Sequence, residues 1–272
     1  MTWFLIPAFI WLAWFSFRYA WWKPTVSYKY PRILMYHMIS EPKSGAKFNG
    51  LRVSPKLFER QVKWFSDNGW NFVTMSELMA YGSEVPEKTV ALTFDDGFED
   101  NLLNAHPIME KYGAKGTLYL VIDRHERDWS TQKKAHHNSG ELVKEAKLSD
   151  EQVRSMIDSG LWEIGGHTET HANLAVISDE DKTREISGAK QALESQFGIK
   201  VDSFAYPFGI YTSEDPEHVC IAGHTNAVTT VEGINRSLMT NRFELDRIKI
   251  SGKDNFFAFI CRVRTGKRGL KK

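Results

Sequence analysis

The chain is poor in cysteine and carries almost no net charge. Only two cysteines occur in 272 residues, Cys220 and Cys261, and they lie far apart without metal-binding spacing. This pattern argues against a disulfide framework and permits a reducing compartment. Lys and Arg number 35 against 34 Asp and Glu, a formal net charge of +1. The positive surplus typical of nucleic-acid-binding proteins is missing, so we expect no nucleic-acid partner.

A long uncharged apolar stretch occurs at the N-terminus. Residues 3–17 read WFLIPAFIWLAWFSF, the first charge is Arg18, and aromatic residues continue to Trp22. About 20 apolar residues suffice for a membrane-spanning helix, and tryptophans at both ends suit the membrane interfaces. We therefore predict a single membrane anchor helix over residues 1–23 and a linker over residues 24–31.

Other interpretations of this stretch compete with a spanning helix. A cleaved signal peptide is disfavoured because the chain has neither a basic n-region nor a small-residue cleavage site. A buried core helix is rarely so aromatic or so terminal. A helix lying in the membrane interface stays open, because the uncharged run is short and Arg18 interrupts it.

The distribution of basic residues predicts an orientation for the anchor. No Lys or Arg precedes the apolar stretch, whereas Arg18, Lys23, Lys29 and Arg32 follow it. The positive-inside rule then places the following domain in the cytoplasm. A basic tail over residues 263–272 suits an anionic leaflet, and a solvated, disordered end is the alternative.

Beyond the linker, predicted strands and helices alternate. Repeated strand–helix units indicate a parallel sheet, and this number of strands suits a closed barrel. We predict an α/β domain over residues 32–262. The expected strands cover 32–36, 71–74, 90–94, 116–122, 162–166, 203–206, 225–230 and 245–250. The expected helices cover 55–68, 101–112, 150–160 and 178–197, with a short helix near 76 and a last helix from 255.

Two short segments at strand ends carry the chemistry. Thr93-Phe94-Asp95-Asp96-Gly97 closes one apolar strand, and His167-Thr168-Glu169-Thr170-His171 follows another. Each has an ordinary alternative: Asp-Asp-Gly is often a turn, and two histidines four apart can share one exposed helix face. Together they supply one carboxylate and two imidazoles for a metal with an open position, plus a second carboxylate. This combination indicates metal-assisted hydrolysis.

An ordered set of motifs resembles the polysaccharide deacetylases with a NodB-homology domain, carbohydrate esterase family four. The resemblance runs from about residue 32 to about 259. It rests on Met35-Tyr36-His37, Val53-Ser54-Pro55, Leu92 to Gly97, Ile164 to His171, Phe204-Ala-Tyr-Pro-Phe-Gly209 and Arg247-Ile-Lys-Ile-Ser-Gly252. It implies a distorted (β/α) barrel with fewer than eight complete units.

The resemblance also implies roles for individual residues. Asp95 corresponds to the general base, and Asp96, His167 and His171 correspond to the ligands of a divalent metal. Mixed nitrogen and oxygen ligands favour Zn²⁺. Tyr206, Pro207 and Phe208 are expected to bind substrate, with the Phe208 N–H holding the oxyanion.

The general acid is where the chain departs from the family pattern. Ala205 stands where better-described members have an arginine, and the terminal segment has no histidine. We predict that His37, which also ends a strand, is the acid; a structural role is the alternative. We expect His224 to be structural and the polar insertion over 123–147, with His125, His136 and His137, to be a solvated loop, a lid being the other interpretation.

Family membership implies an N-acetylated amino-sugar substrate. The membrane anchor and basic tail favour a lipid-linked N-acetylhexosamine used in envelope glycolipid (lipid A) modification, because tethering raises the effective concentration. The predicted location is the bacterial inner membrane, with the catalytic domain facing the cytoplasm. Deacetylation of peptidoglycan or exopolysaccharide outside the membrane is the alternative substrate class, and a non-catalytic sugar-binding membrane protein is the alternative of another kind.

Overall fold

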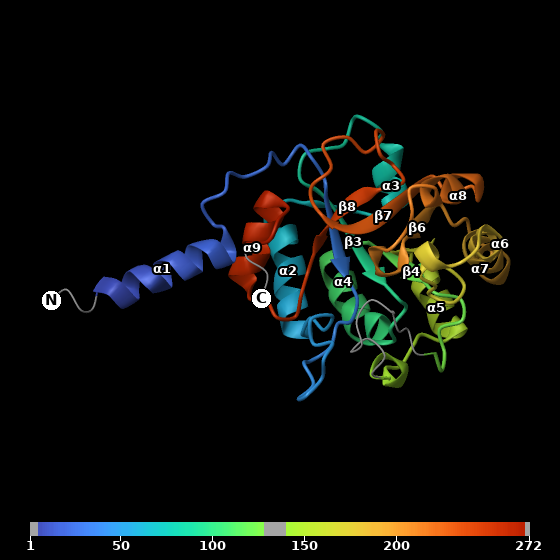
Figure 1. Ribbon diagram of the computed structural model, residues 1–272, viewed down its shortest axis with the longest axis horizontal. Helices are drawn as coiled ribbons and strands as arrows, with labels where there is room; N and C mark the ends of the chain where they lie inside the picture. The colour runs from blue at the N-terminus through green and yellow to red at the C-terminus, as the bar shows by residue number, and fades with distance from the viewer. Residues whose placement is uncertain (1–4, 128–139, 270–272) are drawn as a thin grey trace.

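Seven parallel strands of the described chain close into a barrel. The computed structural model describes residues 5–127 and 140–269 (Figure 1). Each strand of the ring pairs with the next, and β3 pairs with β1 to close it. In ring order the strands are β1 (Arg32–Tyr36), β8 (Leu245–Lys249), β7 (Asn226–Glu232), β6 (Ser203–Ala205), β5 (Trp162–Gly166), β4 (Gly116–Leu120) and β3 (Thr89–Asp95). The predicted α/β barrel is confirmed.

An eighth strand, β2 (Asn71–Val73), lies outside the ring. It pairs with residues 89–91 of β3, and β4 pairs with residues 92–95 of the same strand. Because β1 occupies the opposite edge of β3 over residues 90–94, β2 and β4 must share one edge. The short β2 therefore leaves the barrel one strand below eight, as the resemblance implies.

Helices cover the outside of the barrel (Figure 1). Their starts follow local sequence signals: Ser54 caps a helix with Pro at its first position, and Thr74 and Ser149 each form a capping box. The helix predicted over 101–112 begins with a π-helical turn, and the one predicted over 178–197 contains another. The helices are α2 (Pro55–Asp67), α3 (Met75–Ala80), α4 (His106–Tyr112), α5 (Asp150–Asp158), α6 (Asp179–Thr183), α7 (Ala189–Phe197), α8 (Asp215–Ile221) and α9 (Phe256–Thr265).

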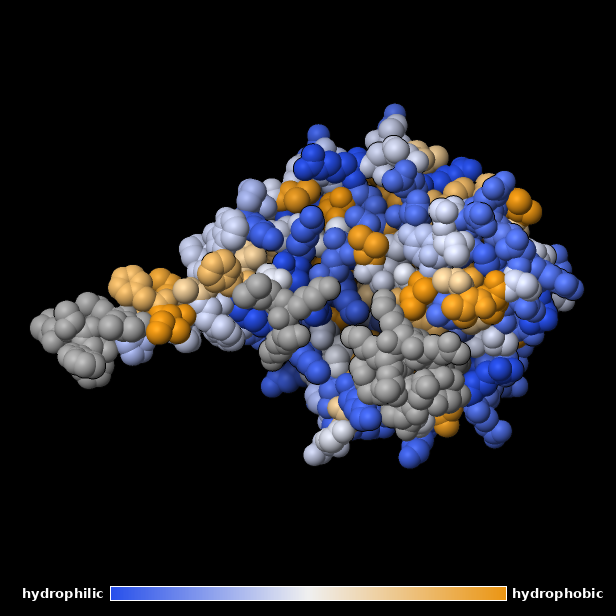
Figure 2. Space-filling view, in the orientation of Figure 1, coloured by the Kyte–Doolittle hydropathy of each residue, from blue (hydrophilic) through white to orange (hydrophobic). Residues whose placement is uncertain are grey.

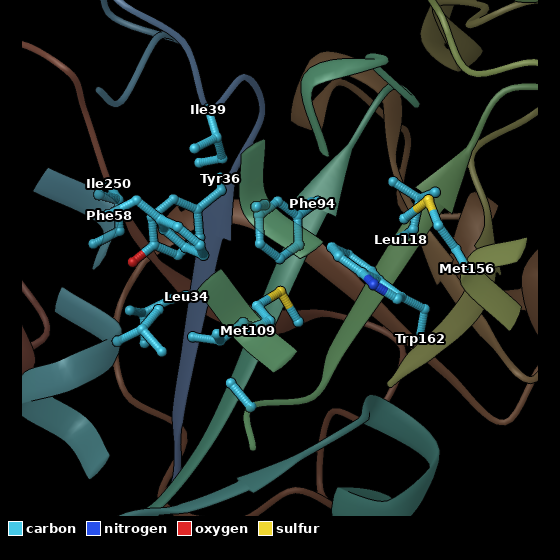
Figure 3. Close-up of a cluster of buried hydrophobic side chains, with 14 of the residues drawn as sticks. Leu34, Tyr36, Ile39, Phe58, Phe94, Met109, Leu118, Met156, Trp162 and Ile250 are labelled. Atoms are coloured by element: carbon cyan, nitrogen blue, oxygen red, sulfur yellow. The ribbon is translucent and has the colours of Figure 1, made fainter. Parts of the chain in front are cut away.

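The main core lies between the barrel and these helices. Figure 3 shows Tyr36, Phe94 and Trp162 from three strands pointing toward the same space. The Phe94 ring lies 5.4 Å from Tyr36 and 5.0 Å from Trp162, centroid to centroid. Successive side chains of a strand alternate between its faces, so Thr93 and Asp95 point into the barrel instead. Because of this alternation, the carboxylate of Asp95, the last residue of β3, lies at the mouth of the barrel.

Helix α1 (Leu5–Tyr19) projects away from the barrel (Figure 1). It has 15 residues, which corresponds to a length of about 22 Å at 1.5 Å per residue. Among the residues that the structure describes, no helix has both the length and the apolar character to cross a bilayer. The prediction of a spanning helix over residues 1–23 is therefore not supported. Residues 1–4 of that prediction lie outside the described part.

The last helix runs into the segment expected to be a basic tail. Helix α9 continues through Thr265, and Gly266 ends it in a left-handed conformation with φ of 72°. Three residues of the predicted tail are therefore helical, and the closing residues 270–272 lie outside the described part.

Candidate active site

Two imidazoles and one carboxylate converge at the carboxyl ends of β3 and β5. Asp96 directly follows β3, and His167 directly follows β5. The Nε2 atoms of His167 and His171 each lie 3.3 Å from Oδ1 of Asp96, and all three side chains are buried. The prospective ligand atoms lie within 4.8 Å of one another. The structure therefore brings together the three residues predicted to hold the metal.

The donor set fits a divalent metal such as zinc. The Nδ1 atom of His167 lies 2.7 Å from the carbonyl oxygen of Ala205. A carbonyl oxygen only accepts, so Nδ1 carries the proton and Nε2 keeps a lone pair that faces Asp96. Burial opposes ionisation of Asp96, but the polar contacts with His167 and His171 hold the pKa of its carboxyl well below its ordinary value. One carboxylate oxygen and two imidazole nitrogens then leave one position of a tetrahedral site open.

The backbone around these ligands adopts an uncommon conformation. Asp96, Thr168 and His171 have φ values of 81°, 66° and 58°, in the left-handed region that non-glycine residues rarely occupy. Each such residue costs about 1–3 kcal/mol, so the surrounding structure must hold it in place. Backbone hydrogen bonds from Asp96 N to Tyr119 O and from His167 N to Leu120 O do so at 3.0 and 3.2 Å. The two histidines therefore lie on a strained loop, and the helix-face alternative is wrong.

Asp95, the predicted base, is held by Arg247 of β8. Nη1 of Arg247 donates to Oδ1 at 2.7 Å, and Nη2 donates to Oδ2 at 2.8 Å. Arg247 is fully buried and also donates to the Thr229 carbonyl and the Thr93 hydroxyl. Burial alone would raise the pKa of Asp95, but the charge and hydrogen bonds of Arg247 lower it below its ordinary value. Asp95 is therefore an ionised carboxylate of fixed orientation.

Arg247 is the functional residue that our sequence reasoning missed. It was placed in a motif but given no role. The available signal was its position in β8: an arginine at an alternating position of a barrel strand must either face solvent or find a buried carboxylate. Which carboxylate it meets depends on barrel closure, because 152 positions separate Arg247 from Asp95.

His37 lies beside Asp95 at the same end of the barrel. It directly follows β1, its Nε2 is 3.9 Å from Oδ2 of Asp95, and its carbonyl accepts a hydrogen bond from Asn101. Burial lowers the pKa of His37, and this outweighs the opposite influence of Asp96 and Asp95. The structure thus places the predicted acid within charge-interaction range of the predicted base.

The side chains of the three predicted substrate-binding residues have different surroundings. The Phe208 ring contacts that of His171 at a centroid distance of 4.3 Å, and Phe208 has a left-handed φ of 58°. Tyr206 instead stacks on Tyr211 at 4.2 Å and donates its hydroxyl to the Phe243 carbonyl. Pro207 is buried between them in the chain. Phe208 therefore contacts a metal ligand. Tyr206 packs on the neighbouring segments at Tyr211 and Phe243 and does not contact the ligands in this way.

Among the described residues, His224 and His125 lie outside this cluster. The ring of His224 packs against Gly166 and Phe204, and burial lowers its pKa to about 3. That environment suits the structural role predicted for it. His125 is exposed, and His136 and His137 lie outside the described residues.

The end of the insertion packs against the loop that follows β1. Glu145 pairs with Lys43 and Arg52 at 2.8 Å each, and Glu141 accepts from the backbone N–H groups of Lys47 and Phe48. Beneath these contacts lies a small apolar cluster of Met38, Phe98, Val121 and Leu142. The segment over 140–147 is therefore docked onto the loop that follows β1.

Comparison with known proteins points to one family. A family model described as polysaccharide deacetylase matches residues 82–226. The chain is 32% identical over 235 residues to YxkH of Bacillus subtilis (strain 168), which is named as a polysaccharide deacetylase; the match covers 85% of this chain and 75% of that one. It is 24% identical over 181 residues to poly-β-1,6-N-acetyl-D-glucosamine N-deacetylase of Staphylococcus aureus (strain MRSA252), covering 63% of this chain and 58% of the relative.

Solved structures agree with this comparison. The deacetylase PplD of Streptococcus pyogenes, solved in complex with acetate, is 28% identical with a TM-score of 0.69, and the match covers 84% of this chain and 94% of that one. The polysaccharide deacetylase BC0361 of Bacillus cereus is 26% identical with a TM-score of 0.70, covering 86% and 69%. Each match covers more than four fifths of this chain.

Proposed function

The chain belongs to the polysaccharide deacetylase family, and from this premise we propose that it removes N-acetyl groups from an N-acetylhexosamine polymer outside the membrane. It is a carbohydrate N-deacetylase with an Asp-His-His metal site. The observation that carries the proposal is the position of Asp95: its carboxylate, fixed by Arg247, directly precedes the ligand Asp96 at the barrel mouth. A non-catalytic sugar-binding protein would not need that second carboxylate.

The residues divide the reaction between them. Asp96, His167 and His171 would hold the divalent metal, which when bound supplies Lewis acidity to a water and to the acetyl carbonyl. Asp95 takes the proton of the attacking water. A carboxylate has about four lone-pair positions and Arg247 occupies two, so a position for that proton is left.

The developing oxyanion and the leaving amine need partners of their own. We assign the Phe208 N–H to the oxyanion, because Phe208 contacts His171 and has the strained backbone typical of such positions. We assign His37 to the amine as the proton donor, because it lies at the barrel mouth beside Asp95, whose negative charge favours the protonated imidazole against the effect of burial. The proton that Asp95 removes from water is thereby matched by one delivered to nitrogen.

The substrate class rests on the named relatives. The Staphylococcus aureus relative is named for a poly-N-acetylglucosamine substrate, and this chain spans 58% of its length. That name favours a polymer over the lipid-linked sugar that the sequence alone favoured. A polymer substrate also requires the catalytic domain to face away from the cytoplasm, opposite to the orientation that the basic residues predict.

The test compares acetate release from three substrates by the purified full chain. These are poly-β-1,6-N-acetylglucosamine, peptidoglycan fragments and a polyprenyl-phosphate-linked N-acetylhexosamine, each with and without a chelator. Chelator-sensitive release from a polymer supports the proposal, and release confined to the lipid-linked sugar overturns it. A reporter fused to the C-terminus checks the orientation: a cytoplasmic C-terminus contradicts the assignment to an external polymer.

A further inference from the structure

Four basic side chains line a small hollow at the root of α1. The hollow lies between α1, α9 and the segment after α9, and its lining includes Arg18, Arg262, Lys267 and Arg268. Its volume of about 10 Å³ has room for about one water-sized atom. A phosphate could seat a single oxygen there and would remain outside with its other atoms. The hollow therefore suits a phosphate that arrives on a surface better than one enclosed by the protein.

The charges at this hollow do not cancel. Asp254 pairs with Arg262 at 2.5 Å, with Arg18 at 3.4 Å and with Arg268 at 3.5 Å. Glu232 pairs with Arg268 at 3.1 Å, and Asp246 lies close enough for Lys267 to influence its pKa. Four cations thus face three carboxylates, which leaves a surplus of one positive charge.

Two guanidinium nitrogens at the hollow lack a well-aligned partner among the described residues. Nη2 of Arg262 and Nε of Arg268 are buried and make no hydrogen bond of acceptable geometry, although each lies within ion-pair distance of a carboxylate. Arg262 is only 4% exposed. Buried guanidinium donors of this kind favour an additional anionic oxygen.

Helix α1 rises from this hollow with apolar side chains on every face. Phe9, Ile10, Trp11 and Leu12 are 69%, 65%, 60% and 49% exposed. Four consecutive positions cover the whole circumference of an α-helix, so the exposed surface is not the stripe of a helix that packs on a protein. Figure 2 shows hydrophobic (orange) surface on the part of the molecule that projects from the catalytic domain.

The base of α1 is fixed to the catalytic domain. The rings of Phe15 and Tyr19 lie 5.6 and 5.2 Å from that of Phe257 at the start of α9, and Asn255 donates to the Tyr19 hydroxyl. Arg18 is held by Asp254 on the same side. The apolar helix and the basic hollow therefore form one rigid feature.

The spacing of the two parts matches one leaflet of a bilayer. From Phe9 to Arg18 the helix rises about 14 Å, and the hydrocarbon of one leaflet is about 15 Å thick. Trp21 and Trp22, which follow the helix, are 45% and 58% exposed at the level where interfacial tryptophans lie. We propose that α1 inserts into one leaflet of an anionic phospholipid membrane while the basic hollow binds a headgroup phosphate.

The proposal is tested by co-sedimentation of the full chain with vesicles. Vesicles of phosphatidylcholine alone are compared with vesicles that also contain phosphatidylglycerol. The double variant Trp11→Ser/Trp14→Ser should lose at least ten-fold in vesicle affinity, and Lys267→Gln/Arg268→Gln should lose about five-fold for each charge removed, on anionic vesicles only. Matched controls are Val176→Ser/Ile221→Ser and Lys200→Gln, which change exposed residues elsewhere and should bind as the unchanged chain does.

Circular dichroism verifies that each variant is folded, and acetate release from a soluble substrate should be the same in all of them. Inorganic phosphate serves as the free anion, with thermal stability as the readout. Stabilisation by phosphate without vesicle binding would assign the hollow to a free anion and overturn the proposal. Equal binding to neutral and anionic vesicles would also overturn it, because the headgroup charge would then play no part.

Discussion

Arg247 and Asp95 form a two-pronged ion pair at the mouth of the barrel. Two guanidinium nitrogens of one side chain donate to the two carboxylate oxygens of the other at 2.7 and 2.8 Å. Such a pair fixes the plane of the carboxylate as well as its charge. Arg247 belongs to β8, whereas Asp95 is the last residue of β3. A strand separated from β3 only by β1 therefore orients the proposed base.

The first prediction concerns the pH dependence that Arg247 imposes. Burial raises the pKa of Asp95, and the positive charge of Arg247 lowers it. The variant Arg247→Ala removes that charge, so the pKa of Asp95 should rise. The acidic limb of the kcat/KM profile should then move to higher pH, with about a hundred-fold loss of kcat/KM at neutral pH. Arg247→Lys retains the charge and should show a smaller displacement of the limb. An unchanged acidic limb in folded Arg247→Ala would contradict the assigned role.

The second prediction concerns the metal. His167→Ala and His171→Ala each remove one of three protein ligands, so the purified chain should no longer retain one equivalent of divalent metal. Elemental analysis by mass spectrometry after dialysis provides the measurement. His125→Ala, which changes an exposed histidine, is the matched control and should retain the metal. Full metal content in both ligand variants would rule out this site.

The third prediction separates the base from the ligands. Asp95→Asn keeps the size of the side chain but removes the proton acceptor, so metal content should stay at the level of the unchanged chain. Acetate release should fall by about 10²- to 10⁴-fold, the usual contribution of a general base. The two quantities are measured on the same preparation. Activity at the unchanged level would show that another group accepts the proton.

The fourth prediction concerns His37. A general acid acts mainly in the transition state, so His37→Ala should lower kcat more than it raises KM. Steady-state kinetics on an oligosaccharide substrate separates the two parameters. Tyr36→Phe removes only the hydroxyl bonded to Gln61 on the core side of the same strand, and serves as a control that should keep both parameters. A change confined to KM in His37→Ala would assign His37 to substrate positioning.

Local sequence signals predicted most of the secondary structure. Ser54-Pro55 and the capping box at Ser149 locate helix starts, because a cap is formed by residues only a few positions apart. Local signals do not specify where α1 ends. The apolar character of residues 3–22 is visible in the sequence, whereas the helix ends at Tyr19, whose ring packs against Phe257 of α9.

The sequence by itself determined that Asp96, His167 and His171 would meet, since ligands at the carboxyl ends of parallel strands share one rim of the barrel. Only the tertiary structure decided which charged group faces Asp95. Barrel closure brings β8 beside β1 and β1 beside β3, and this inserts Arg247 into the barrel next to a carboxylate 152 positions away. The partial burial of His37, the separation of the Tyr206 and Phe208 side chains and the basic hollow beneath α1 likewise depend on distant segments. Their charges and contacts follow from three-dimensional proximity, which no local pattern specifies.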